Sequence, residues 1–237
     1  MAQRAPGAGR WTVRLGVAAV VAFVSGPVLA HLGIVPALLG FVVFDLGGLL
    51  GLIAALAGIV ALVRGAGGTA LAGLIPAVVV AGVFLKAAAG AGGVPRINDI
   101  TTNTQQAPEF VQAGSQPANA GRDMKYPGES FAQQQRAGYP TLTGLALPGS
   151  PDEVYRRVSA TAKQMPTWQI TRDDPAAHAL EGVDTTWLFR FQDDFVIEVR
   201  AREGGSIVEM RSKSRDGKGD TGTNAKRIEA FFAKLKS

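Results

Sequence analysis

Long apolar runs dominate the first 90 residues of the chain, and shorter alternations of apolar and polar residues follow later. The apolar runs cover residues 13–30, 46–63 and 69–85, and each is about long enough to cross a hydrocarbon core of ~30 Å as a helix. The pattern therefore predicts a membrane region over residues 1–89 with three helical spans. Asp45 is expected at the outer end of the second span.

The pattern beyond residue 139 predicts an α+β domain over residues 140–237. Ser150, Pro151 and Glu153 are typical of a helix start, because Ser caps the helix, Pro suits its first turn and Glu completes a capping box. Pro166 ends this helix. A C-terminal helix is indicated by the apolar spacing of Ile228, Phe231, Phe232 and Leu235.

Between the two expected helices the apolar residues alternate, which is typical of strands. The expected strands contain Trp168 and Ile170, then Trp187 to Phe191, then Phe195 to Val199, then Val208 and Met210. Short turns join them, so they form an antiparallel β-meander with one apolar face under the helices. The other face is expected to be open to solvent and carries Arg190, Glu198, Arg200, Arg202, Glu209, Arg211 and Lys213.

Residues 90–139 are rich in Gly, Pro, Gln, Ala and Asn and show no sustained period, so they are expected to form a linker and an extended segment. Four scattered apolar anchors predict that parts of this linker lie against a folded surface: Phe110, Met124, Tyr126 and Phe131.

Charge separates the two halves of the chain. Of 24 basic and 19 acidic residues, six basic and one acidic lie up to Arg96, which leaves 18 of each beyond it. The neutral C-terminal half argues against nucleic-acid binding. Arg4, Arg10 and Arg14 precede the first span and Arg64 lies between the other two, so the positive-inside rule predicts a cytoplasmic N-terminus.

These features predict a multi-pass protein of the bacterial cytoplasmic (inner) membrane with a periplasmic, extracytoplasmic C-terminal domain. The first apolar run also resembles a cleavable signal peptide, and cleavage would leave the C-terminal domain outside as well. Small residues four apart in the second span favour close helix contact, either within the bundle or between copies in a homo-oligomer.

The motif Gly217 to Gly222 fits G-x-G-x-x-G, but its preceding strand alternates like a half-exposed antiparallel strand, and no second parallel strand follows. No nucleotide or other cofactor is therefore expected. The sequence contains no cysteine and His178 stands alone, so no metal site is expected either. The glycines suit a loop, with Asp220 or Thr223 capping the last helix.

Basic residues around this loop form a candidate site for an anion, such as an anionic lipid or an envelope ligand, because guanidinium groups and helix N-termini both favour oxyanions. The alternative is a solvated face whose charges pair across strands with Glu198 and Glu209. The candidate ligand-binding residues are Arg211, Arg215, Lys218, Asp220, Asn224 and Arg227.

Catalysis has weaker support. Asp173, Asp174, Asp193 and Asp194 are expected in turns with neighbouring side chains pointing apart, and Ser212 and Ser214 lack a convincing base. The sequence favours a non-catalytic binding or scaffolding module. The alternative is a hydrolase-like envelope enzyme that acts on a lipid or a cell-wall component.

Three motifs, INDITTN, TTWLFRFQDDFVIEVR and RSKSRDGKGDTGTNAKRIEAFF, together resemble the bacterial and plastid family known as domain of unknown function 1499. The resemblance covers roughly Pro95 to Leu235, and a three-span N-terminus is common among bacterial members. Residues 112–135 depart from the family pattern. The resemblance implies the fold and the cellular place, but it implies no activity and no catalytic residue.

Overall fold

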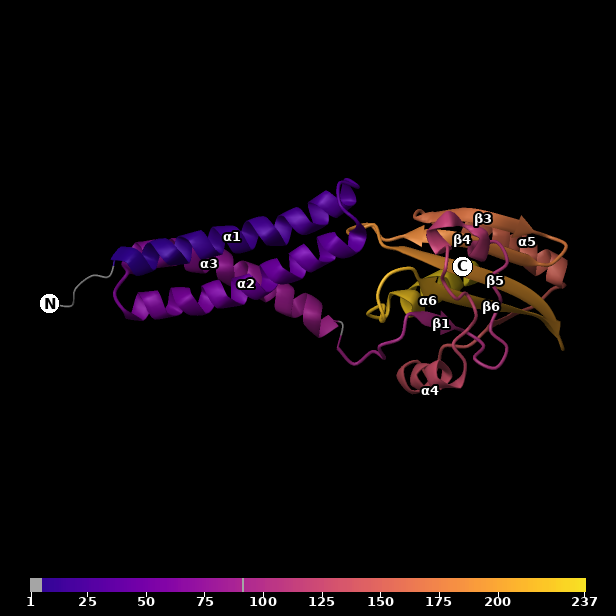
Figure 1. Cartoon of the computed structure of the whole chain (residues 1–237). Coiled ribbons are helices and arrows are strands. Elements are labelled where there is room, and N and C mark those ends of the chain that lie inside the picture. Colours follow the sequence, from indigo (N-terminus) through magenta and orange to yellow (C-terminus); the bar gives the residue numbers. More distant parts are fainter. Residues whose placement is uncertain (1–5, 91) are drawn as a thin grey trace. The chain divides into compact units, whose positions relative to one another are not determined.

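Three long apolar helices form the N-terminal part of the chain in the computed structural model, which describes residues 6–90 and 92–237 (Figure 1). They are α1 (Pro6–His31), α2 (Ala37–Val63) and α3 (Gly67–Gly90). Each is long and apolar enough to cross a membrane, which confirms the three predicted helices. Arg4 lies outside the described residues.

Helix α2 begins earlier than the sequence pattern suggested. The predicted span started at residue 46, but the apolar stretch that follows Pro36 continues the same helix. Asp45 therefore lies inside α2 and not at its outer end, which corrects the expectation. A single Asp does not end a helix when the residues around it are Val, Phe and Leu.

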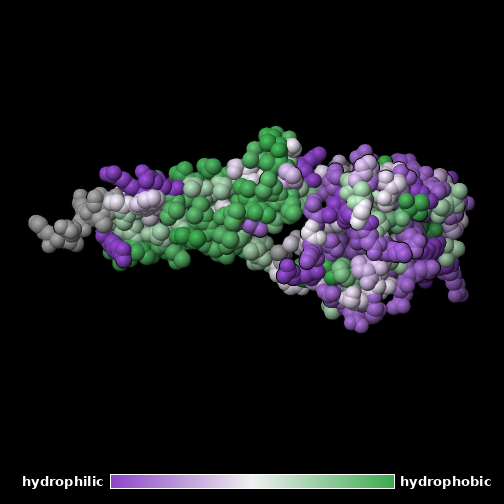
Figure 2. Space-filling model, in the orientation of Figure 1, coloured by the Kyte–Doolittle hydropathy of each residue, from purple (hydrophilic) through white to green (hydrophobic). Residues whose placement is uncertain are grey.

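Small residues let the three helices approach one another closely. Gly47 packs against the backbone of Phe23 in α1, and Gly51 packs against Val80 in α3. The spaced glycines of α2 are thus used within the bundle. Figure 2 shows a largely apolar outer surface on these helices, as expected where helices contact lipid.

The rest of the chain forms a six-stranded antiparallel sheet with three further helices (Figure 1). The sheet order is β1-β6-β5-β4-β3, and β2 also pairs with β6. The strands are β1 (Asp99–Thr101), β2 (Leu145–Leu147), β3 (Trp168–Asp174), β4 (Ala179–Thr185), β5 (Gln192–Arg202) and β6 (Gly205–Ser214), and the helices are α4 (Glu129–Gly138), α5 (Pro151–Ala162) and α6 (Thr223–Lys236). Two 3-10 turns, Ala113–Ser115 and Pro117–Asn119, precede α4.

Helices α5 and α6 cover one face of the sheet and enclose the core. The ring of Trp168 lies 4.0 Å from that of Phe195 and 5.1 Å from that of Phe231, measured between centroids. Helix α5 starts with the predicted capping box, in which Ser150 and Glu153 satisfy each other's backbone N–H groups. The α+β fold class with helix, antiparallel sheet and C-terminal helix is confirmed.

One predicted strand is wrong, and strands β2 and β4 were not expected. A strand was expected from Trp187 to Phe191, but Trp187–Arg190 form a turn in which Arg190 has a φ of 66° and the Thr186 N–H donates to the Phe191 carbonyl. Strand β4 contains Glu, Gly and Asp, which disfavour strands, so its pattern gave no strand signal. Its pairing with β3 and β5 overrides that weak local preference.

The chain divides into two compact units. One contains residues 1–92 with Trp187–Arg190, and the other contains Gly93–Thr186 and Phe191–Ser237. The segment expected to be a linker thus belongs to the second unit. Within that unit it covers the sheet face opposite to α5 and α6, where Glu181 accepts hydrogen bonds from the backbone N–H groups of Val111, Gln112 and Ala113.

This cover corrects the expectation of a solvent-exposed second face. Glu209, Arg211 and Lys213 are buried, whereas Arg202 is exposed at the end of β5. Charged residues on this face alternate with apolar residues in the same way whether water or a folded segment covers the face. The charge pattern alone could not distinguish these two cases.

Candidate functional site

Arg211, the largest fully buried side chain of the described residues, makes a two-pronged ion pair. Its Nε and Nη2 atoms donate to the two carboxylate oxygens of Asp99, both at 2.8 Å. Lys213 Nζ donates to the same carboxylate at 2.9 Å. β1 pairs with β6 in a register that sets Asp99 opposite Lys213, so all three side chains share one face of the sheet.

The remaining contacts of Arg211 hold the covering segment. Its guanidinium donates to the carbonyl oxygens of Pro108 and Met124. It also lies 4.8 Å from the ring centroid of Phe110 and 5.5 Å from that of Tyr126, within cation–π range. Burial and the nearby Asp99 carboxylate raise the pKa of Tyr126 to about 12. Arg211 is thus fully engaged inside the fold.

Arg227 joins helix α6 to the sheet on the face that the helices cover, which is opposite to the face that carries Arg211. Its guanidinium forms ion pairs with Asp184 on β4 and Asp193 on β5 and donates to the hydroxyl of Ser212. Burial raises the pKa of Asp193, and the charge of Arg227 opposes that shift. Asn224 accepts from the Ser212 hydroxyl and donates to the Ser214 hydroxyl.

Arg215 is also paired. Its guanidinium contacts both carboxylate oxygens of Asp194, at 3.0 and 2.6 Å, and Arg122 lies 3.5 Å from the same carboxylate. Asp193 and Asp194 are neighbours on β5 and project to opposite faces, as strand geometry requires. The expectation that they lie in a turn is therefore wrong, although their side chains do point apart.

Two of the six candidate residues lie in the glycine loop itself. The Asp220 carboxylate accepts from the backbone N–H groups of Gly222 and Asn224, so it caps the start of α6. Lys218 is exposed. Gly217 and Gly222 have φ values of 77° and 83°, a backbone region that favours glycine. The loop geometry is therefore that of a helix cap.

The candidate residues do not converge on a shared open surface. Arg227 and Asn224 lie together on the helix-covered face, Arg211 lies on the other face, and Lys218 projects from the loop. The partners that sequence analysis missed are carboxylates: Asp99, Asp184, Asp193 and Asp194. No local sequence signal identified Asp99 as a partner, because the pairing depends on the register of β1 with β6.

The groups considered for catalysis are similarly engaged. The hydroxyls of Ser212 and Ser214 are buried and hydrogen-bonded to Asn224. Asp173 accepts from Tyr155 and Ser159 and pairs with Lys163, which holds its pKa below the ordinary value. His178 Nε2 lies 2.6 Å from Asp152. Within the described residues no group of three or more His, Cys, Asp or Glu could hold a metal ion.

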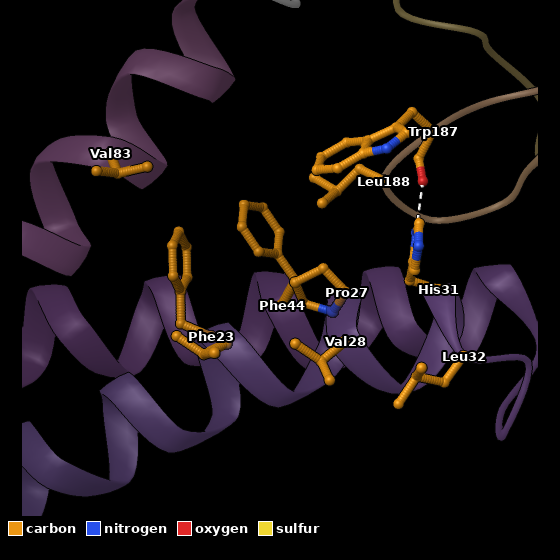
Figure 3. Close-up of a pocket in the computed structure, with 10 residues that line it drawn as sticks. Phe23, Pro27, Val28, His31, Leu32, Phe44, Val83, Trp187 and Leu188 are labelled. Carbon is orange, nitrogen blue, oxygen red and sulfur yellow. Dashed lines mark hydrogen bonds between the residues drawn. The ribbon is translucent and has the colours of Figure 1, made fainter.

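The helical unit contains an apolar pocket of about 460 Å³ near the C-terminal end of α1 (Figure 3). Its walls come from α1, α2, α3 and the segment between β4 and β5, and include Phe23, Pro27, Val28, Leu32, Trp187 and Leu188. His31 lies at this end, and its Nδ1 is 2.8 Å from the Trp187 carbonyl oxygen. Sequence analysis gave no sign of this pocket, because its residues come from segments far apart in the chain.

Comparison with known proteins gives one match. The family model described as Protein of unknown function (DUF1499) matches residues 99–235, and neither a curated protein nor a solved structure matches the chain. The match begins at Asp99 and includes β6 and α6, so it spans the three ion-pair networks described above. The chain belongs to the family of proteins of unknown function DUF1499.

Proposed function

We propose that this protein is a membrane-anchored binding or scaffolding module whose sheet domain lies outside the cytoplasmic membrane. The observation that carries the proposal is the charge asymmetry of the helical unit. Arg10, Arg14 and Arg64 mark one end of the antiparallel helices. The segment Trp187–Arg190, which joins two strands of the sheet, contacts the other end through His31.

The positive-inside rule assigns the arginine-bearing end to the cytoplasm. The opposite ends of the three helices then face the outside, and the chain that follows α3, which forms the sheet domain, continues there.

Binding fits the described side chains better than hydrolysis does. A hydrolase that acts on a lipid or wall component would need a nucleophile open to its substrate. Ser212 and Ser214 are instead buried within a hydrogen-bond network, and the nearby carboxylates pair with arginines. An anion-binding role would therefore rest on exposed cations near the glycine loop, such as Lys218 and Lys226.

Reporter fusions test the proposed orientation. Alkaline phosphatase fused after Ser237 should be active, and green fluorescent protein fused there should be dark, because phosphatase matures outside the cytoplasm and the fluorescent protein matures inside. Fusions at Gly65, in the turn between α2 and α3, provide the matched control and should give the opposite pattern. A fluorescent fusion after Ser237 with inactive phosphatase would refute the orientation.

A further inference from the structure

The apolar pocket of the helical unit has the size and chemistry of a ligand site. Its volume of about 460 Å³ lies within the ~300–1,000 Å³ usual for such sites. The side chains that line it come mainly from the three membrane-length helices. In a bilayer the molecules next to these helices are lipids, so the available apolar ligand is an acyl chain.

Two features of the chain shape the walls of this pocket. Pro27 lacks a backbone N–H and cannot donate to the Phe23 carbonyl one turn earlier, which weakens α1 at the pocket wall. Trp187 and Leu188 form a second wall and are held by the contact between the Trp187 carbonyl and His31 Nδ1 (Figure 3). A carbonyl oxygen only accepts, so Nδ1 carries the proton in this contact.

Two exposed cations lie close in the chain to residues of the apolar walls. Lys86 follows the pocket residue Val83 by three positions, so both lie on the same side of α3. Arg190 follows Leu188 by two positions in the segment that forms the second wall. An apolar pocket whose wall residues have exposed cations two or three positions away in the chain suits a molecule with an acyl chain and an anionic headgroup.

We propose that the pocket binds one acyl chain of an anionic phospholipid taken from the surrounding bilayer, with the headgroup phosphate near Lys86 and Arg190. The inference rests on the proposed function only in that the helices are inserted in a membrane. It does not depend on which side the sheet domain occupies.

Native mass spectrometry of the full chain, released from nanodiscs of mixed phosphatidylglycerol and phosphatidylcholine, tests the proposal. The wild-type protein should retain one phosphatidylglycerol. Val83→Trp should fill the pocket and lower the lipid-bound fraction at least tenfold. Val79→Trp is the matched control, because Val79 lies one turn earlier on α3, is exposed and is absent from the pocket wall, and it should retain the lipid.

The double substitution Lys86→Gln and Arg190→Gln separates the headgroup from the chain. It should lower the preference for phosphatidylglycerol over phosphatidylcholine about fivefold per cation removed, while the protein still retains a lipid. An unchanged preference would refute the headgroup assignment. Equal lipid retention by the two Val variants, or no retained lipid in the wild type, would refute the pocket assignment.

A photoreactive acyl chain on phosphatidylglycerol gives a second measurement that needs no variant. Cross-links should concentrate on peptides that contain Val28, Leu32 or Leu188, and cross-links spread evenly over the three helices would overturn the proposal. The outcome of the reporter fusions is independent of the outcome of the cross-linking experiment. An inverted topology with pocket-specific cross-links would refute the orientation and retain the lipid site.

Discussion

Arg211 illustrates how one residue can resemble a ligand-binding group in sequence and serve as a structural centre in the fold. Burying a guanidinium and a carboxylate removes both from water, and the desolvation cost is offset only where geometry and further hydrogen bonds are good. Arg211 meets that condition through Asp99, two backbone carbonyls and two aromatic rings. Its role is therefore to attach the covering segment to the sheet.

Replacing Arg211 by Gln should cost about 3–5 kcal/mol of unfolding free energy, because the substitution breaks a buried pair and releases the covering segment. Lys218→Gln serves as the control and should stay within about 0.5 kcal/mol, since Lys218 is exposed on the loop. Urea titration of the full chain in detergent, followed by tryptophan fluorescence, measures both. Equal stability of the two variants would show that Arg211 does not carry this structural role.

The sequence identified the charged residues of the candidate site but not their partners. Arg211, Arg215 and Arg227 each lie in or beside a loop rich in glycine, which favoured an anion site. Their carboxylate partners lie far away in the chain, with Asp99 separated from Arg211 by 112 positions. Such pairing depends on the sheet register between β1 and β6, which no local pattern reveals.

Helix α6 shows what the glycine loop does at the scale of an element. A helix start leaves backbone N–H groups without partners, and the Asp220 carboxylate satisfies those of Gly222 and Asn224. The same helix carries Arg227 and Asn224 to the sheet. The position of Asp220 therefore influences the network at the first turn of α6.

Asp220→Ala should lower the unfolding free energy by about 0.5–2 kcal/mol, the usual cost of removing a helix cap. Asp220→Asn should recover part of this loss, because its single side-chain oxygen can accept one of the two hydrogen bonds that the two carboxylate oxygens of Asp220 accept. Thermal unfolding followed by circular dichroism distinguishes the three proteins. If Asn and Ala gave the same loss, the charge of Asp220 and not its capping would be responsible.

Elements with their own local signals could be predicted, and elements that depend on tertiary pairing could not. Helix α5 has a capping box and α6 has an apolar face, so both were expected correctly. Strand β4 forms because β3 and β5 offer their backbone groups on both sides, despite its Gly182 and Asp184. Residues 187–190 are rich in apolar side chains without forming a strand, because they belong to the helical unit.

At the scale of the whole molecule, the second unit has its own core and contains the three ion-pair networks, so it should fold without the helices. A fragment of residues 93–237 with Trp187 and Leu188 changed to Ser should be soluble and unfold in one cooperative transition. The two substitutions remove apolar side chains that belong to the other unit. Persistent aggregation would show that the helices complete the core.

A shorter fragment of residues 140–237 provides the comparison. It keeps the sheet core between α5, α6 and the strands from β2 onward, but it removes Asp99 and the backbone groups that bind Glu181. It should aggregate, because deleting β1 leaves an unpaired edge on β6 and removes the core side chains of Ile97 and Ile100. A stable short fragment would show that residues 93–139 are dispensable for folding.

The pairing of Asp99 with Arg211 also fixes when folding can finish. At a synthesis rate of about 5–20 residues per second, the 112 positions between them separate their appearance by on the order of ten seconds. During that interval β1 has no strand to pair with, and the covering segment has no sheet to cover. The first residues of the domain to be made are thus among the last to become ordered, and an interrupted chain would leave them exposed.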